Sequence, residues 1–230
     1  MSAPRIAVVS FPGTCDDRDA AFAITACGGE PVRVWHHDED LQGADGVLLP
    51  GGFSFGDYLR AGALASLSPA MSAAVRFAEV GGPVLGVCNG FQMLCEARLL
   101  PGVLRPNHHG RFTCLDAPLV VERTSAWLGR RDAGSEIVIP VKHHDGAWFA
   151  PDEEVERLEA NGQVLLRYAV DLNGASARIA GVVNAAGNVF GLMPHPEHAV
   201  DPVLGSVDGR LVLGGLIELA AERMTVGATR

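Results

Sequence analysis

The hydrophobic residues of this chain gather in short runs, which glycine, proline and charged residues separate. Several runs are rich in β-branched residues and show no polar alternation, which is typical of strands covered on both faces of a sheet. We therefore expect strands over residues 6–11, 31–35, 46–49, 84–87, 137–141, 164–168, 179–184 and 189–193.

Helical patterns lie between the early strands, and each has a recognisable start or stop. Asp16 or Asp17 could cap a first helix that ends before Gly28, and Ser68 precedes Pro69 at the start of a second. These signals predict helices over residues 20–26, 71–80 and 211–224, and a further one that begins at residue 89.

The order of these elements predicts the fold class. Strands and helices alternate over the first part of the chain, which indicates an α/β fold built on a parallel sheet. Residues 112–168 are richer in strands and are expected to add antiparallel strands at one edge. Because no repeat, low-complexity segment or linker interrupts the pattern, we expect a single domain over residues 1–230.

Composition narrows the classes of function. The chain is 48% hydrophobic and 20% charged, with a formal net charge of −9. We expect neither nucleic acid nor a membrane as a partner, because there is no basic excess to bind phosphate groups. No apolar run reaches the length of a membrane-spanning helix, and the first residues lack the layout of a signal peptide. These features predict a cytoplasmic protein.

The segment VLGVCNGFQML, residues 84–94, joins a predicted strand directly to a predicted helix. Only a tight turn can do this, and Cys88 lies at its apex between Gly86 and Gly90, which leave room for the chain to fold back. The pattern matches the nucleophile elbow G-x-S-x-G with sulfur in place of oxygen. The positive end of the helix beginning at Asn89 would stabilise a thiolate, and the Asn89 N–H could hold an oxyanion.

A small buried hydrophobic residue is the alternative interpretation of Cys88, and this segment alone leaves both open. The cysteines number five and have no CxxC spacing, so neither a disulfide framework nor a zinc site is expected. The remaining four lack the glycine frame and are expected to have no catalytic role: Cys15, Cys27, Cys95 and Cys114.

A cysteine nucleophile needs a histidine base and a group that orients the histidine. His195 and Glu197 stand two residues apart in MPHPEH, at the end of a predicted strand. We expect the two prolines to keep this piece extended, so that Glu197 supports His195 from the same face. Since functional residues gather at the carboxyl ends of parallel strands, His195 and Cys88 can meet.

Metal binding is an alternative use of histidine, because most histidines of the chain form neighbouring pairs: His36-His37, His108-His109 and His143-His144. Neighbouring residues on a strand point to opposite faces, so each pair could easily supply only one ligand. We therefore expect no metal site.

The glycine-rich segment LLPGGFSFGDY, residues 48–58, follows the third predicted strand. Gly51 and Gly52 let backbone N–H groups approach a ligand closely, which suits a phosphate or an oxyanion. No GK[ST] follows, so a phosphate loop is the weaker interpretation, and a plain turn is another. We expect a second oxyanion donor from the N–H of Gly52 or Phe53. Gln92 is also near the site by its position and is expected to take part in substrate binding.

Together, the cysteine elbow, the His-Pro-Glu segment and the Gly-Gly loop resemble the class I (triad) glutamine amidotransferase family. The likeness covers nearly the whole chain, through GGFSFGDYLRAGALA, VLGVCNGFQMLCEARLLPG, NGQVLLRYAV and GLMPHPEHAVDPVLGSVDG. It implies a flavodoxin-like three-layer sandwich with a mostly parallel central sheet. It also implies that Cys88 is the nucleophile, His195 the base and Glu197 its orienting carboxylate.

The resemblance further implies a glutaminase that hydrolyses glutamine and passes ammonia to a large synthetase subunit, with a small accessory subunit in the same complex. ATP and Mg²⁺ are then used by the synthetase, and this chain is expected to bind no cofactor of its own. Two departures from the family leave roles open: His198, where relatives usually have arginine, and His143-His144-Asp145-Gly146, where relatives often have His-Gly-Glu-Gly.

Other classes of function stay open at this point. A stand-alone cysteine hydrolase or a thiol-based stress protein could use the same fold, although neither needs Glu197 or the segment GGFSFGDYLRAGA. A non-catalytic binding protein is disfavoured by the intact Cys88, His195 and Glu197. If the chain docks on a synthetase, the rim near Cys88 is the expected surface, with these candidate contacts: Phe53, Phe55 and Tyr58.

Overall fold

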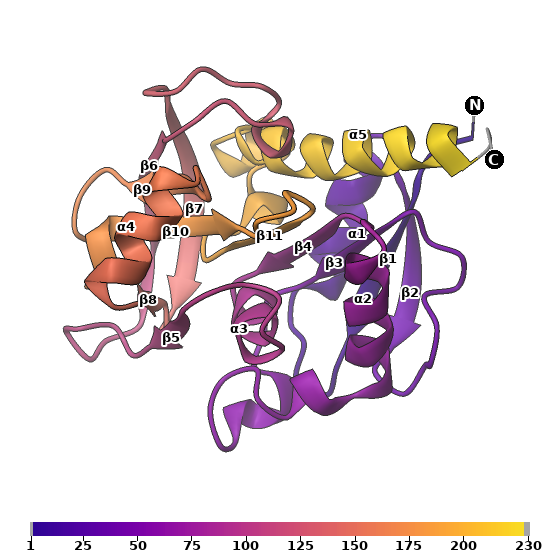
Figure 1. The fold of residues 1–230 in the computed structure, drawn as a ribbon, viewed down its shortest axis with the longest axis horizontal. Coiled ribbons are helices and arrows are strands. Elements are labelled where there is room, and N and C mark those ends of the chain that lie inside the picture. Colours follow the sequence, from indigo (N-terminus) through magenta and orange to yellow (C-terminus); the bar gives the residue numbers. More distant parts are fainter. Residues whose placement is uncertain (1, 228–230) are drawn as a thin grey trace.

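The centre of the protein is a nine-stranded sheet, seen in the computed structural model, which describes residues 2–227 (Figure 1). Residue 1 and residues 228–230 of the predicted domain lie outside the described residues. The strands follow the order β2-β1-β3-β4-β11-β10-β9-β6-β7, and a second sheet pairs β5 with β8.

Five parallel strands form one half of the large sheet, in the order β2-β1-β3-β4-β11. This is the strand order of flavodoxin-like folds, so the predicted fold class is confirmed. Strands β3, β4 and β11 carry no polar side chain and are buried throughout, which is why they read as continuous apolar runs. The five are β1 (Arg5–Ser10), β2 (Glu30–Trp35), β3 (Gly46–Leu49), β4 (Val84–Val87) and β11 (Val189–Leu192).

The other half of the sheet is antiparallel, as expected for an added edge. Its strands are β6 (Thr113–Val121), β7 (Glu136–His143), β9 (Val164–Tyr168) and β10 (Ile179–Val183); the small sheet consists of β5 (Val103–Arg105) and β8 (Ala147–Phe149). The eight strands predicted individually are all present. Strands β5 and β8 are very short and β6 is half exposed, so none of them forms an apolar run.

Helices cover both faces of the parallel strands. Helices α1 (Asp17–Ala26) and α5 (Gly209–Gly227) pack together on one face, and α2 (Pro69–Glu79) and α3 (Asn89–Glu96) cover the other (Figure 1). Ser68, which precedes Pro69 at the predicted helix start, is the N-cap of α2, because its hydroxyl accepts a hydrogen bond from the Met71 N–H at 3.2 Å. Among residues 2–227, no helix is both long enough and apolar enough to cross a bilayer.

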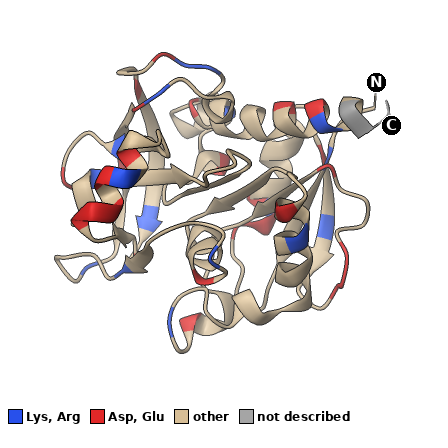
Figure 2. Ribbon diagram, viewed as in Figure 1, with Lys and Arg blue, Asp and Glu red and all other residues tan. Residues whose placement is uncertain are grey.

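Helix α4 (Asp152–Ala160) was not predicted, because it lies inside the strand-rich region. Its first turn is acidic and it buries only Val155 and Leu158, so its sequence is mostly polar. Figure 2 shows these charges on α4 and the scarcity of charge on the central strands. Short turns of 3₁₀ helix complete the fold: η1 (Ser54–Asp57), η2 (Ala65–Leu67), η3 (Ala126–Leu128), η4 (Ser176–Arg178), η5 (Pro196–His198) and η6 (Pro202–Leu204).

The direction of the strands decides which loops meet. Strands β10, β9, β6 and β7 reverse direction one after another, so β7 runs the same way as β4 and β11. The carboxyl end of β7, with Lys142 and His143, therefore lies at the same edge as Cys88 and His195. The loop after β1 and the glycine loop after β3 also end there.

Candidate active site

Cys88 lies at a strained turn between β4 and α3. Its backbone angles, φ 51° and ψ −105°, are rare for a residue with a side chain. A side chain at Gly86 would collide with Leu94 and the Gly90 backbone, and one at Gly90 would collide with the Leu49 carbonyl. The structure therefore has the elbow geometry that the sequence predicts, and both glycines are needed for it.

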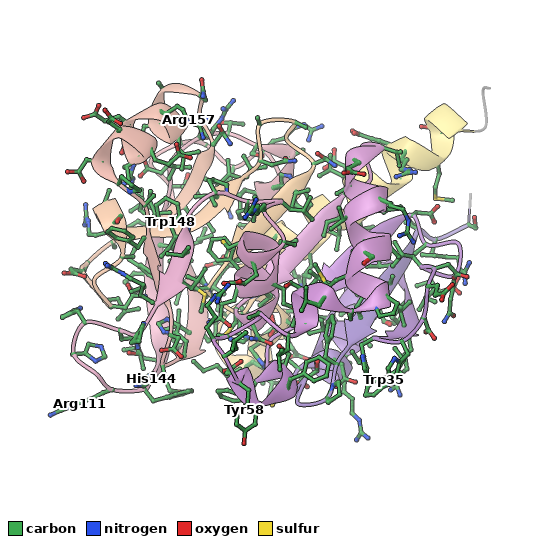
Figure 3. The ribbon with its side chains drawn as sticks, turned by 60° about the horizontal axis from the view of Figure 1, so that its bottom comes forward. Trp35, Tyr58, Arg111, His144, Trp148 and Arg157 are labelled. Atoms are coloured by element: carbon green, nitrogen blue, oxygen red, sulfur yellow. The ribbon has the colours of Figure 1, made fainter. Side chains whose placement is uncertain are left out.

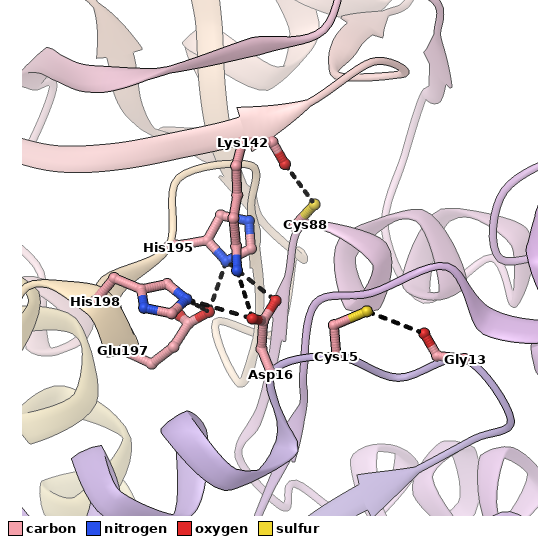
Figure 4. Close-up of polar contacts among 8 residues, drawn as sticks. All are labelled: Gly13, Cys15, Asp16, Cys88, Lys142, His195, Glu197 and His198. Atoms are coloured by element: carbon pink, nitrogen blue, oxygen red, sulfur yellow. Dashed lines mark hydrogen bonds and ion pairs between the residues drawn. The ribbon is translucent and has the colours of Figure 1, made fainter.

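The structure brings His195 and Glu197 together beside this elbow. The Nδ1 atom of His195 lies 2.6 Å from Glu197 Oε1, and both side chains are almost completely buried. The other ring nitrogen, Nε2, has no hydrogen-bond partner among residues 2–227 and lies on the side of the ring facing Cys88 (Figure 4). Burial would lower the pKa of His195, but the Glu197 carboxylate and the Cys88 sulfur outweigh it and raise that pKa to about 10.

The backbone of this segment differs from the prediction. Residues Pro196–His198 form the 3₁₀ turn η5 and are not extended. The fixed φ of proline suits the first position of a helical turn as well as an extended chain, so the prolines did not decide between the two. The turn itself brings Glu197 back toward the imidazole. The backbone N–H of His195 donates to the Pro140 carbonyl at 2.8 Å and anchors the residue.

Either Asp16 or Asp17 was expected to cap α1, but the helix has no side-chain cap. Asp16 occupies the N-cap position but makes no capping hydrogen bond, and Asp17 is the first residue of the helix. The Asp16 carboxylate turns toward the site, where Oδ1 lies 2.5 Å from Lys142 Nζ and 3.3 Å from His198 Nε2 (Figure 4). Burial would raise the Asp16 pKa, but His198, charged His195 and Lys142 hold it well below its usual range.

The glycine loop was expected to offer one oxyanion donor, from Gly52 or Phe53, and Gly52 remains the candidate. The Phe53 N–H donates to the Gly13 carbonyl at 2.9 Å, so it is not free to hold an oxyanion. The Gly52 N–H donates to no backbone acceptor within the described part of the chain, and Gly52 lines the same pocket as Cys88. The Asn89 side chain joins the two segments, because its Oδ1 accepts a hydrogen bond from the Ser54 N–H at 3.1 Å.

Gln92 lines the pocket, but its amide is engaged within the protein. Its Oε1 accepts from Asn89 Nδ2 at 2.8 Å, and its Nε2 donates to the Asp145 carbonyl at 2.7 Å. The bond to Asp145 ties α3 to the loop after β7. At the end of β7, His143 is buried against Asn107 and burial lowers its pKa to about 4, whereas His144 in the following loop is exposed (Figure 3).

Cys88 and His195 line one small pocket of about 70 Å³ together. Asn89 and Glu197 lie behind its wall. Asp57 faces this pocket half-buried, and burial together with the Asp145 carboxylate raises its pKa to about 6. The lining residues come from the four loops and strand ends at this edge of the sheet and from the segment before β6: Cys15, Asp16, Gly52, Phe53, Asp57, Cys88, Gln92, Phe112, Lys142, His143, His144, Asp145 and His195.

Four groups near the pocket could also hold a cation. Asp16, His195, Glu197 and His198 place potential ligand atoms within 4.8 Å of one another. The Lys142 ammonium already neutralises Asp16, and the bond to Glu197 occupies His195 Nδ1. A metal ion would have to displace both, so these residues fit a proton-sharing network better than a metal centre.

Sequence reasoning missed Asp16 and Lys142 as site residues. Both lie near the carboxyl end of a strand, Asp16 after β1 and Lys142 near the end of β7. The rule that placed Cys88 and His195 at this edge could have singled out Asp16. It could not have found Lys142, because the direction of β7 depends on pairings that the sequence does not reveal.

Fold and site together are typical of an enzyme with a cysteine nucleophile. Residues 3–210 match the family model of the CobB/CobQ-like glutamine amidotransferase domain. The chain belongs to this family of glutamine amidotransferases, so the family resemblance found in the sequence is confirmed.

Curated relatives refine the comparison. The chain is 53% identical over 227 residues to phosphoribosylformylglycinamidine synthase subunit PurQ of Leifsonia xyli, covering 98% of both chains. It is 53% identical over 219 residues to the PurQ subunit of Novosphingobium aromaticivorans, covering 92% of this chain and 97% of the relative.

Solved structures agree with this placement. The structure of PurLQS from Thermotoga maritima contains a chain that is 41% identical, with a TM-score of 0.87, covering 94% of this chain and 98% of that one. A putative GMP synthase subunit from Thermoplasma acidophilum is 17% identical, with a TM-score of 0.70 and 99% coverage of both chains. At that identity, the second similarity concerns the fold alone.

Proposed function

We propose that this chain is the glutaminase subunit of a phosphoribosylformylglycinamidine synthase. It hydrolyses glutamine to glutamate and passes ammonia to an ATP-dependent synthetase subunit, which converts formylglycinamide ribonucleotide to formylglycinamidine ribonucleotide in purine biosynthesis. The observation that carries the proposal is the buried His195, held by Glu197 at 2.6 Å and facing Cys88, in a chain 53% identical to PurQ subunits.

In the proposed reaction, the Cys88 thiolate attacks the side-chain amide carbon of glutamine. The N–H groups of Asn89 and Gly52 hold the oxyanion, and loss of one such donor typically slows a reaction by about 10²–10³-fold. His195 gives its Nε2 proton to the amide nitrogen, so ammonia leaves and a γ-glutamyl thioester remains. Water then attacks the thioester as His195 accepts its proton, and glutamate leaves as the thiolate is restored.

Glu197 does not touch the substrate in this scheme. By accepting the Nδ1–H bond it fixes the ring so that Nε2 faces the sulfur, and its charge stabilises the imidazolium. Gln92 and Asn89 act through the loops that they connect, because their side-chain amides already bind protein groups. Gln92 is therefore a positioning residue here, in place of the direct substrate contact expected.

Ammonia in water is mostly protonated at neutral pH and is then no nucleophile. The glutaminase should therefore release it into a protected path within a complex that contains the large synthetase and a small accessory subunit. ATP and Mg²⁺ would be bound by the synthetase, and this chain would bind no cofactor. The whole chain would act as one glutaminase domain, and the cytoplasmic location expected from the sequence stays a prediction.

The test is to purify the chain with its synthetase and accessory subunits and to measure ATP-dependent amination of formylglycinamide ribonucleotide. Glutamine and an ammonium salt serve as alternative nitrogen donors. Cys88→Ala should abolish the rate with glutamine and keep the rate with ammonium. Retention of the glutamine rate would refute the proposal, and strong glutamine hydrolysis by the isolated wild-type chain would contradict tight coupling.

A stand-alone cysteine hydrolase is the second candidate, and a glutamine-analogue electrophile distinguishes it. The analogue should label Cys88, and glutamine should block the labelling. Cys95 should stay unlabelled, because it is buried and its burial raises its pKa, which keeps the thiol protonated. Labelling that glutamine does not block would favour the stand-alone hydrolase.

A further inference from the structure

Asp16 is a buried carboxylate to which the proposed reaction assigns no role. Its side chain is only 4% exposed, although it stands at the head of a surface helix that it does not cap. Its backbone N–H donates to the Gly51 carbonyl at 3.2 Å, and its Oδ2 lies 3.6 Å from His195 Nδ1. Asp16 thus connects the glycine loop with the imidazole.

Lys142 reaches the same network from the opposite side of the pocket. Its ammonium lies 2.5 Å from Asp16 Oδ1, and its backbone carbonyl lies 3.9 Å from the Cys88 sulfur. Lys142 therefore contacts the Cys88 sulfur with its backbone carbonyl and Asp16, the neighbour of His195, with its side chain. The Asp16 carboxylate of this pair is buried while the Lys142 side chain is one-third exposed, and burying a carboxylate has a desolvation cost, so its position beside His195 calls for an explanation.

We propose that Asp16 and Lys142 are positioning residues: a pair of opposite charges that holds the His195 ring against Cys88 and balances its protonation. The inference rests on the proposed role of His195 as the base. The charged and titratable groups around the ring come from the elbow, the head of α1, β7 and η5: Cys88, Asp16, Lys142, His143, Glu197 and His198.

The two charges act on His195 with opposite signs. The Asp16 carboxylate favours the imidazolium, and the Lys142 ammonium disfavours it. The effects of the two charges largely cancel, so the protonation equilibrium of His195 stays where Glu197 and Cys88 set it. Neutralising Asp16 should therefore lower the pH at which His195 loses its proton. Neutralising Lys142 should raise that pH.

Iodoacetamide alkylation of Cys88 in the full chain tests this directly, because its rate changes with pH as the neighbouring imidazolium loses its proton. Asp16→Asn should shift that step to lower pH by about one unit, the size expected for loss of one adjacent charge. Lys142→Met should shift it to higher pH by a similar amount. The double variant should return close to wild type, and Lys142→Arg, which keeps the cation, should resemble wild type.

Asp19→Asn is the matched control, since Asp19 is exposed in the first turn of α1 and carries the same charge. Shifts in the same direction for both single variants, or slower alkylation at every pH without a shift, would overturn the inference. If Asp16→Asn fails to fold, the comparison of Lys142→Met with Lys142→Arg still shows whether loss of the Lys142 charge shifts the alkylation step to higher pH. Alkylation involves no glutamine, so it is independent of the test of the proposed function. If the variants show the expected pH shifts in alkylation but the complex cannot use glutamine, only the proposed function is refuted.

Discussion

Gly51 and His195 are packed so closely that position 51 has no room for a side chain. A Cβ atom there would lie 2.6 Å from His195 Cε1 and 2.5 Å from Asp16 Oδ2. The first glycine of the loop is thus required by the imidazole and its neighbouring carboxylate, whereas Gly52 is required by the backbone path, since a Cβ there would collide with the backbone of residues 13–15. The two glycines have different tasks.

Gly51→Ala should therefore damage the glutaminase without affecting the synthetase. The added methyl must displace the His195 ring, and displacement of a catalytic group by about 1 Å can lower a rate about 10²-fold. We expect a loss of that size in glutamine-dependent amination by the complex, with the ammonium-dependent rate unchanged. Gly214→Ala is the control, because position 214 on α5 has open space around it. An unchanged glutamine rate in Gly51→Ala would show that the ring does not need its observed place.

Glu197→Gln tests the charge behind the imidazole while keeping the shape of the side chain. The amide can still accept the Nδ1–H bond but no longer stabilises the imidazolium, so kcat should fall by about 10²–10⁴-fold. Because Glu197 raises the pKa of His195 to about 10, its removal should shift the alkaline limb of the pH–rate profile to lower pH. The profile of kcat for glutamine hydrolysis by the complex measures both effects.

The exposed Glu79 provides the control for that change, as Glu79→Gln removes the same charge far from any assigned role. Its kcat and its alkaline limb should match wild type. If Glu197→Gln lowered kcat but left the alkaline limb in place, the carboxylate would be acting through geometry alone.

Sequence predicted the elements that are determined locally. The inner strands read as apolar runs because helices cover both of their faces, and the elbow at Cys88 is visible because it needs Gly86 and Gly90 nearby. The partnership of His195 with Glu197 was found for a related reason, since the two residues are only two apart.

What sequence could not predict depends on the whole fold. Lys142 reaches Asp16 across 126 positions, and only the successive strand reversals up to β7 bring it to the right edge. Asp16 looked like a possible helix cap because local signals cannot show that the Lys142 ammonium lies nearby. The Phe53 N–H looked available for the same reason, since its acceptor, Gly13, belongs to a different loop.

Asp57→Asn should stabilise the protein at neutral pH. The folded-state pKa of Asp57 is raised from 3.8 to about 6, so the fold favours the protonated acid, and ionisation destabilises it as pH rises through that range. Asn removes the charge and tolerates the left-handed backbone at this position, where φ is 55°. Because Asp57 is only half-buried, we expect a gain of about 1 kcal/mol in the free energy of unfolding at pH 7.

Urea unfolding at several pH values measures this gain. The difference between Asp57→Asn and wild type should be full above pH 6 and should vanish below about pH 3.8, where Asp57 is protonated in both states. Asp116→Asn, on the exposed side of β6, should show no such dependence. A gain that persisted unchanged at acid pH would mean that the charge of Asp57 is not its source.

Tyr58 is the residue at which docking on the synthetase can be tested most directly. It is 76% exposed and points away from the molecule beside the pocket rim (Figure 3), and Leu59 next to it is 81% exposed. Large exposed apolar side chains that cluster on one loop are typical of protein interfaces. Phe55, also expected as a contact, is half-buried with its ring 5.3 Å from that of His36, so it supports the loop from inside.

Tyr58→Ser should therefore weaken binding of the chain to its synthetase by about tenfold or more, as loss of an aromatic interface residue often does. The rate of Cys88 alkylation in the isolated chain should not change, because Tyr58 is exposed and does not line the pocket that Cys88 and His195 share. Val203→Ser is the control, since Val203 is 91% exposed and lies outside the pocket lining. Equal binding of Tyr58→Ser and wild type in a direct titration would place the interface on another face. Weaker binding together with slower alkylation would instead mean that this loop shapes the active site itself.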